Sequence, residues 1–170
     1  MIGVGIVGCN YGRTVLIPAF RRDRRCEVVA LAGTDAARTA ELARAANVAC
    51  GLGDWQALVE APTVKVVAVA VPPHLQPAIA QRALELGKPV FLEKPLAADL
   101  AGAQMILEAA RQSDRPTIID FNFPELPSWQ RAKAILEGGT IGRSRSLPRS
   151  RGFFSFLVSM MKAAPPSFDV

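Results

Sequence analysis

The chain has 170 residues, half of them hydrophobic, a size that suits one domain or one domain with a tail. No apolar run approaches the ~20 residues that a membrane-spanning helix needs, and the N-terminus lacks the pattern of a secretory signal. The net charge is +5, but residues 143–170 hold five basic residues against one acidic residue, so residues 1–142 are nearly neutral. The basic charge therefore gives no indication of a nucleic-acid partner for the main part of the chain.

The chain contains three cysteines, Cys9, Cys26 and Cys50, in apolar or turn-forming stretches. Their odd number argues against a disulfide framework, and their spacing matches no metal site. We therefore expect no bound metal, and a cytoplasmic location.

A strand, a glycine-rich turn and a helix start follow one another at the N-terminus. Residues 2–7 are an apolar strand, and a helix is expected to begin at Thr14. The turn between them is the predicted phosphate-binding loop, because glycines allow close approach of the backbone to a phosphate and the first N–H groups of a helix favour an anion. Its residues are Gly8, Cys9, Asn10, Tyr11, Gly12 and Arg13.

This loop departs from the regular G-x-G-x-x-G pattern. Asn10 stands where the second glycine is usual, and Gly12 comes one place before the third, where Arg13 stands. Asn tolerates the left-handed backbone conformation, so the turn remains feasible. A literal G-x-G-x-x-G at residues 3–8 has no strand before it and is not the phosphate loop. The alternative is a buried strand and turn that bind nothing.

Strands and helices alternate through residues 1–139. The expected strands are residues 2–7, 26–32, 48–51, 63–71, 89–92 and 116–121. The expected helices are residues 14–21, 35–47, 55–60, 75–86, 99–113 and 128–137. This alternation predicts an α/β fold, a Rossmann-type doubly wound parallel sheet with helices on both faces.

Side chains at three helix starts support these boundaries. The expected N-caps are Asp35 (or Thr34), Asp54 and Asp99. Trp55 is expected to be a packing anchor. In the helix at 99–113 the predicted apolar stripe is Leu100, Ala103, Ile106, Leu107 and Ala110.

Ligands of doubly wound sheets bind outside the carboxyl ends of the strands. Four features of the sequence are expected at that edge. They are the first turn, Gly33-Thr34, Pro72-Pro73-His74 and Glu93-Lys94-Pro95. Their coincidence at one edge favours a ligand-binding site there.

Residues 5–20, 27–35 and 70–97 read GIVGCNYGRTVLIPAF, EVVALAGTD and AVPPHLQPAIAQRALELGKPVFLEKPLA. Together they resemble the N-terminal domain of the glucose–fructose oxidoreductase, inositol dehydrogenase and MocA family, over residues 1–142. The resemblance implies a Rossmann domain that binds NAD or NADP and hydride transfer to or from a carbon bearing a hydroxyl or carbonyl, usually on a sugar or cyclitol. It also implies a second α/β domain, which is missing here.

The resemblance also assigns roles to residues. Lys94 matches the family's lysine near the nicotinamide ribose, where its ammonium can polarise a carbonyl or help move a proton. The alternative is that Lys94 only forms an ordinary exposed ion pair with Glu93. The cofactor-binding positions Pro72, Pro73 and Glu93 belong to the same edge, and Pro95 matches a position that is often cis. His74 is given no catalytic role, because the family's histidine falls two places later, at Gln76.

The choice of cofactor is made at the end of the second strand. An acidic residue there favours NAD, whereas this chain has Gly33-Thr34. The Thr34 hydroxyl and Arg38 can accept a 2′-phosphate, which favours NADP over NAD. Arg38 as an ordinary solvated helix residue is the alternative.

The composition changes abruptly after residue 142, into Arg/Ser-rich sequence followed by an apolar segment at 153–161. We expect residues 143–170 to be an aberrant or poorly ordered end, such as a shifted reading frame produces; translation of the other two frames of the coding DNA tests this. A genuine tail that docks its apolar segment on the sheet or on a partner is the alternative.

The expected function is that of the cofactor-binding domain of an NAD(P)-dependent oxidoreductase in truncated form, because family members are about twice as long. Cofactor binding is expected, and turnover without the missing half is in doubt. The alternative is a non-catalytic nucleotide-binding or interaction module. The expected partners are a nicotinamide dinucleotide and a second copy or a full-length relative, and exposed apolar surface predicts aggregation of the isolated chain.

Overall fold

The computed structural model describes residues 1–140. The chain forms two compact units, Met1–Asp120 and Phe121–Val170, the second described only as far as residue 140. The predictions for residues 143–170 therefore lie outside the described residues.

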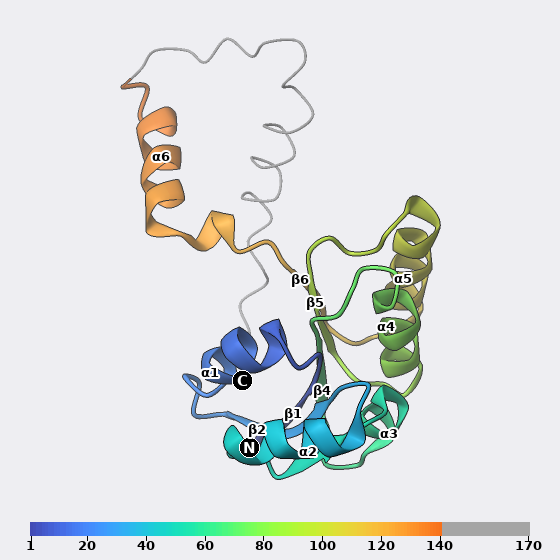
Figure 1. Cartoon of the computed structure of the whole chain (residues 1–170). Coiled ribbons are helices and arrows are strands. Elements are labelled where there is room, and N and C mark those ends of the chain that lie inside the picture. The colour runs from blue at the N-terminus through green and yellow to red at the C-terminus, as the bar shows by residue number, and fades with distance from the viewer. Residues whose placement is uncertain (141–170) are drawn as a thin grey trace. The chain divides into compact units, whose positions relative to one another are not determined.

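The first unit is built on a six-stranded sheet (Figure 1) in which every pair of neighbouring strands is parallel. The strands are β1 (Ile2–Val7), β2 (Cys26–Ala32), β3 (Cys50–Leu52), β4 (Val66–Val69), β5 (Val90–Glu93) and β6 (Thr117–Asp120). Their order in the sheet is β3-β2-β1-β4-β5-β6, which is the doubly wound order with its switch point between β1 and β4. The predicted fold class is confirmed.

Helices cover both faces of this sheet. A π-helical turn, Gly12–Leu16, continues into α1 (Ile17–Phe20), and the other helices of the first unit are α2 (Ala36–Ala45), α3 (Trp55–Glu60), α4 (Gln76–Glu85) and α5 (Leu100–Gln112). In Figure 1, α4 and α5 run side by side, and they contact each other. The described part of the second unit holds a 3₁₀ turn, Phe123–Glu125, and α6 (Pro127–Glu137).

The core consists of two clusters, because alternate residues of each strand face opposite sides of the sheet. On one side Val4 and Ile6 of β1 pack with Leu16 and Ile17. On the other side Val7 belongs to a cluster with side chains of α3, α4 and α5. The apolar runs of the central strands are thus buried on both faces, as expected of a parallel sheet.

Three aspartates cap helices as the sequence predicts. The carboxylate of Asp35 accepts a hydrogen bond from the Arg38 amide at 2.9 Å. Asp54 accepts from the first-turn amides of α3, and Asp99 accepts from the Gly102 amide at 2.8 Å. These caps fix the points at which α2, α3 and α5 leave the sheet edge.

Two predictions about helices were wrong. Helical structure begins at Gly12 rather than at Thr14, because Tyr11 already has helical backbone angles. The predicted stripe of α5 is not buried as a whole, because Ile106 is 2% exposed but Leu100 is 73% and Leu107 47% exposed. The reason is that α5 packs chiefly against α4, so only a narrow face of it is covered.

Within residues 1–140, no helix is long and apolar enough to cross a membrane. The same residues contain no group of three or more His, Cys, Asp or Glu side chains that could hold a metal ion.

Candidate functional site

The glycine turn after β1 has a backbone that only glycine can adopt. Gly8 has φ of 118° and donates its amide to the Ala32 carbonyl of β2 at 2.9 Å. A Cβ at this position would lie 2.1 Å from the Ala70 carbonyl oxygen, beyond the end of β4. Gly8 therefore lets the chain leave the sheet between β2 and β4, at the switch point of the fold.

Gly12 performs the packing role that the regular motif gives to its third glycine. A Cβ on Gly12 would lie 2.7 Å from Cγ2 of Ile6, so the helix start could not pack as closely on β1 with any other residue. Arg13, which occupies the usual position of that glycine, is only half-buried. The one-residue shift in the motif thus moves the contact to Gly12.

Asn10 does not adopt the left-handed conformation that the sequence left open to it. Among residues 1–140 the only non-glycine residue with positive φ is Asn47. The Asn10 carbonyl instead accepts the amide of Thr14 at 3.1 Å. The amides of residues 11–13 precede this bond, and they are the first-turn donors that a helix offers to an anion.

A cleft of about 620 Å³ opens beside this turn, at the carboxyl ends of β1, β2 and β4. Six of the predicted cofactor-binding residues line it: Gly8, Cys9, Asn10, Thr34, Arg38 and Pro72. The other six lie outside the lining: Tyr11, Gly12, Arg13, Pro73, Glu93 and Lys94. The structure therefore brings the glycine turn, the end of β2 and the loop after β4 to one cavity.

Several lining residues were not predicted as site residues. Trp55 packs on the core, as expected, but it also lines the cleft together with Leu42, Leu75 and Ile79. Trp55 directly follows the N-cap of a helix that begins at the same sheet edge, which is the signal that could have placed it there. These apolar side chains give the cleft a wall suited to the flat face of a base.

The polar side chains that follow β2 differ in whether they already have a hydrogen-bond or ion-pair partner. The Asp35 carboxylate forms the N-cap of α2. The backbone carbonyl of Asp35 accepts a hydrogen bond from the Thr39 hydroxyl at 2.5 Å. Thr34 and Arg38 are exposed on the cleft, and Arg38 makes no ion pair with any described residue. Among residues 1–140, neither the Arg38 guanidinium nor the Thr34 hydroxyl has an ion-pair or hydrogen-bond partner, and both line the cleft.

An acidic pair lies at the ends of β5 and β6. Glu93 and Asp120 are register partners in the parallel ladder, and Glu93 is only 8% exposed, with Oε1 unpartnered among the described residues. Burial, and then the neighbouring Asp120, raise the pKa of Glu93. Burial, followed by the charges of Glu93 and Asp120, also raises the pKa of Tyr11. Asp120 was missed, although its place at the end of a strand next to Glu93 could have revealed it.

Lys94 lies on the loop that follows β5, and its side chain is exposed. Within the described chain it forms no ion pair with Glu93, which was the alternative role considered for it. The Lys94–Pro95 peptide is cis, as the resemblance implied for that position. The Pro95 carbonyl accepts a hydrogen bond of 2.7 Å from Nε2 of Gln76, the first residue of α4.

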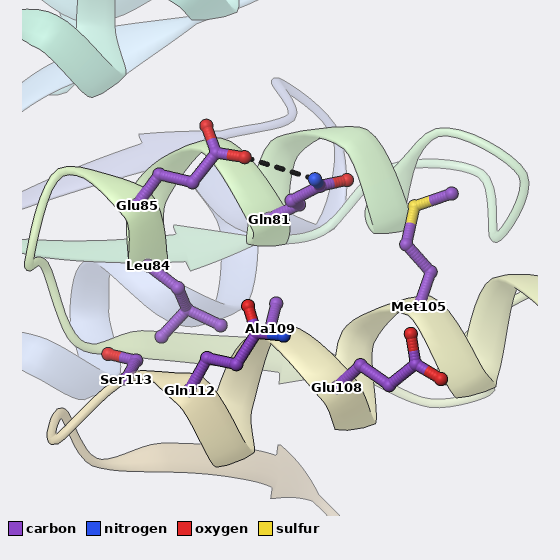
Figure 2. Close-up of a pocket in the computed structure, with 8 residues that line it drawn as sticks. All are labelled: Gln81, Leu84, Glu85, Met105, Glu108, Ala109, Gln112 and Ser113. Carbon is purple, nitrogen blue, oxygen red and sulfur yellow. Dashed lines mark hydrogen bonds between the residues drawn. The ribbon is translucent and has the colours of Figure 1, made fainter.

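A second pocket, of about 390 Å³, lies between α4 and α5 and contains none of the predicted residues. Figure 2 shows its lining, in which Gln81 donates to Glu85 at 3.0 Å and Met105 and Glu108 face them from α5. It is a groove between two helix surfaces rather than a site at the carboxyl edge of the sheet. The candidate site is therefore the cleft beside the glycine turn.

The strand order, the glycine turn at the switch point and the cleft beside it define a dinucleotide-binding Rossmann domain. Residues 2–121 match the oxidoreductase family described as having an NAD-binding Rossmann fold. The chain belongs to this family, that of glucose–fructose oxidoreductase, inositol dehydrogenase and MocA, and carries its NAD-binding domain.

Three relatives illustrate the match. An uncharacterised oxidoreductase of Synechocystis is 31% identical over 140 residues, which are 82% of this chain and 38% of the relative. Inositol 2-dehydrogenase of Pseudomonas fluorescens is 32% identical, covering 84% of this chain and 42% of the relative. The crystal structure of a 3-ketoreductase of Actinomadura kijaniata with NADP is 29% identical, with a TM-score of 0.76, over 83% of this chain and 45% of that one. This chain thus spans less than half the length of these relatives.

Proposed function

We propose that this chain is the cofactor-binding part of an NADP-dependent oxidoreductase that acts on a CH–OH group or the corresponding carbonyl of a sugar or cyclitol. The observation that carries the proposal is the cleft at the switch point of the sheet, entered by the Gly8 turn. The names of the relatives, an inositol dehydrogenase and a ketoreductase, support the class of substrate.

The described residues fit a dinucleotide. The amides of residues 11–13, which donate to no backbone carbonyl in the described part of the chain, suit a pyrophosphate. The apolar wall with Trp55 and Leu75 suits a base. Gly8, Cys9 and Asn10 allow a ligand to approach the backbone of the turn, and Pro72 forms the wall after β4. When bound, the nicotinamide accepts or supplies the hydride.

Lys94 is the proposed catalytic residue. It follows β5 at the same edge of the sheet as the glycine turn, is exposed, and has no ion-pair partner in the described residues. A cationic ammonium there can stabilise charge that develops on a substrate oxygen, or hold the proton that accompanies hydride transfer. Glu93, the residue before Lys94, is proposed to be a cofactor-binding residue. Its carboxyl group is buried.

The preference for NADP over NAD rests on the residues after β2. An acidic residue that binds the ribose 2′-OH favours NAD, but here the Asp35 carboxylate is held by the Arg38 amide at the start of α2. The guanidinium of Arg38 and the hydroxyl of Thr34 remain available to a 2′-phosphate. The related 3-ketoreductase was crystallised with NADP, which agrees with this preference.

An Arg38→Ala variant tests the cofactor preference. Loss of a charge-assisted bond to the 2′-phosphate should weaken NADPH binding by about 10-fold or more, while NADH binding stays within about 2-fold. Binding is followed by nicotinamide fluorescence, with Arg44→Ala, an exposed arginine outside the cleft lining, as the matched control. An equal loss for both cofactors, or no loss for either, would contradict the preference.

We propose that the cofactor-binding domain extends over residues 1–142, and that the chain pairs with a second copy or a full-length relative. The three cysteines are free thiols, which supports a reducing, cytoplasmic location.

A further inference from the structure

We propose that Gln76 is a positioning residue, which ties the Lys94–Pro95 loop to the wall of the cofactor cleft. The proposal rests on the proposed function, because that function makes Lys94, which lies on this loop, the catalytic residue. The geometry of Gln76 itself is independent of that function.

The side chain of Gln76 is fully buried, at 0% exposure, although it is polar. Its Nε2 donates to the Pro95 carbonyl at 2.7 Å across 19 positions of the chain. Its Oε1 is buried and has no partner among the described residues. Burying an amide with one end unpaired costs free energy that an apolar residue would avoid, so the single bond to Pro95 needs a reason beyond packing.

The loop that receives this bond has few other polar attachments. Outside the regular helices and strands, no backbone–backbone hydrogen bond among residues 1–140 involves residues 94–98. Lys94 and Pro95 are both exposed, and Leu96 is the loop residue that packs against the core. The amide of Gln76 is therefore a principal constraint on the direction in which the chain leaves β5.

The other end of the connection lies beside the cleft. Gln76 is the first residue of α4 and directly follows Leu75, which lines the cleft together with Pro72. The Leu75 amide donates to the Pro72 carbonyl at 2.9 Å, so residues 72–75 form one turn. A ligand that packs against this wall restrains the turn, and Gln76 passes the restraint to Pro95. Cofactor binding and placement of Lys94 are thereby coupled through one side chain.

The test measures limited proteolysis by elastase after Ala97 and Ala98 in the full chain without cofactor, with the cleavage sites assigned by mass spectrometry. In Gln76→Met, which keeps the length of the side chain but has no donor, cleavage at these sites should be about 5-fold faster, the effect of one lost hydrogen bond. Gln76→His returns an N–H donor and should restore most of the protection. Gln56→Met, the same change at an exposed position of α3, is the matched control and should have no effect.

Acetylation of Lys94, followed by mass spectrometry, is the second readout. At fixed pH its rate should increase in Gln76→Met, because the loop that carries Lys94 is held less tightly, and return toward that of the unaltered chain in Gln76→His. The rate at Lys65, an exposed lysine on another loop, should be the same in every variant and reports general loosening. Unchanged cleavage after Ala97 and Ala98 in Gln76→Met, or failure of Gln76→His to restore the slower cleavage while Lys65 is unaffected, would overturn the positioning role.

NADPH is added in a separate arm. NADPH should slow cleavage after Ala97 and Ala98 in the unaltered chain and do so less in Gln76→Met. Equal slowing in both would overturn the coupling. Absence of NADPH binding to the unaltered chain would refute the proposed function, and the cofactor-free arm would still decide the role of Gln76.

Discussion

At the scale of single residues, Gly8 is the position on which the site depends most. It combines a φ of 118° with a Cβ position 2.1 Å from the Ala70 carbonyl oxygen. Gly8→Ala should therefore lower the free energy of unfolding by about 3 kcal/mol or more and abolish NADPH binding. Urea denaturation and fluorescence titration measure the two effects.

Gly87→Ala is the control for this prediction. Gly87 also has positive φ, 68°, but the nearest atoms to its Cβ position are 3.7 Å away. The variant should lose only about 1 kcal/mol and bind NADPH normally. Equal losses in the two variants would show that the close approach to Ala70 is unimportant.

The buried carboxyl group of Glu93 predicts a dependence of stability on pH. Burial and Asp120 raise its pKa in the folded chain, against an opposing effect of Lys94. The stability that the protonated form contributes is fully present below the unfolded pKa and is lost as the pH rises through the folded pKa. Glu93→Gln should therefore raise the urea midpoint at pH 8 and change it little at pH 4.

Glu41→Gln, an exposed change on α2, is the matched control and should show no such difference between the two pH values. A urea midpoint for Glu93→Gln that falls at pH 8 would mean that the ionised carboxylate stabilises the fold, contrary to this reading.

Sequence reasoning named six of the residues that line the cleft, but it could not assign every role. The glycine turn, Thr34, Arg38 and Pro72 could be predicted because their residue types are tied to backbone geometry at strand ends. The packing role of Gly12 could not, because it depends on the distance to Ile6. The roles of Gln76 and Asp120 could not be predicted either, because each depends on a partner distant in the sequence, Pro95 for Gln76 and Glu93 for Asp120.

At the scale of elements, α5 shows how periodicity can mislead. Its apolar pattern predicts a broad buried stripe, yet Ile106 is its only fully buried residue. Ile106→Ala should lower the free energy of unfolding by about 3 kcal/mol, through lost burial and a cavity. Leu107→Ala, at a site 47% exposed, should cost less than about 1 kcal/mol. Similar losses by urea denaturation would mean that Leu107 is covered in solution.

The existence and order of the elements could be predicted better than their ends. The expected strand at 63–71 is a paired strand only over Val66–Val69, although Lys65 and Ala70 on either side each still donate an amide to β1. The helix after β1 starts early because Tyr11 enters the helical conformation directly after the turn. Such limits are set by tertiary pairing, which the local sequence does not encode.

At the scale of the whole molecule, the alternation of strands and helices and the right-handedness of their crossovers limit the topology to a few parallel sheets, of which the structure has the order β3-β2-β1-β4-β5-β6. The same order leaves β6 as the last strand of the described sheet, with Ile118 at 51% exposure. An apolar edge strand promotes self-association. The chain should therefore elute above monomer size in sizing chromatography, and Ile118→Lys should reduce this. A monomeric unaltered chain would contradict the prediction.

The central claim is that the cleft beside Gly8 binds a nicotinamide dinucleotide. The most direct test is titration of the full 170-residue chain with NADPH and with NADH, followed by nicotinamide fluorescence. We predict saturable binding of both below millimolar concentration, with NADPH the tighter, and loss of binding in Gly8→Ala. No binding of either dinucleotide at millimolar concentration would contradict the claim.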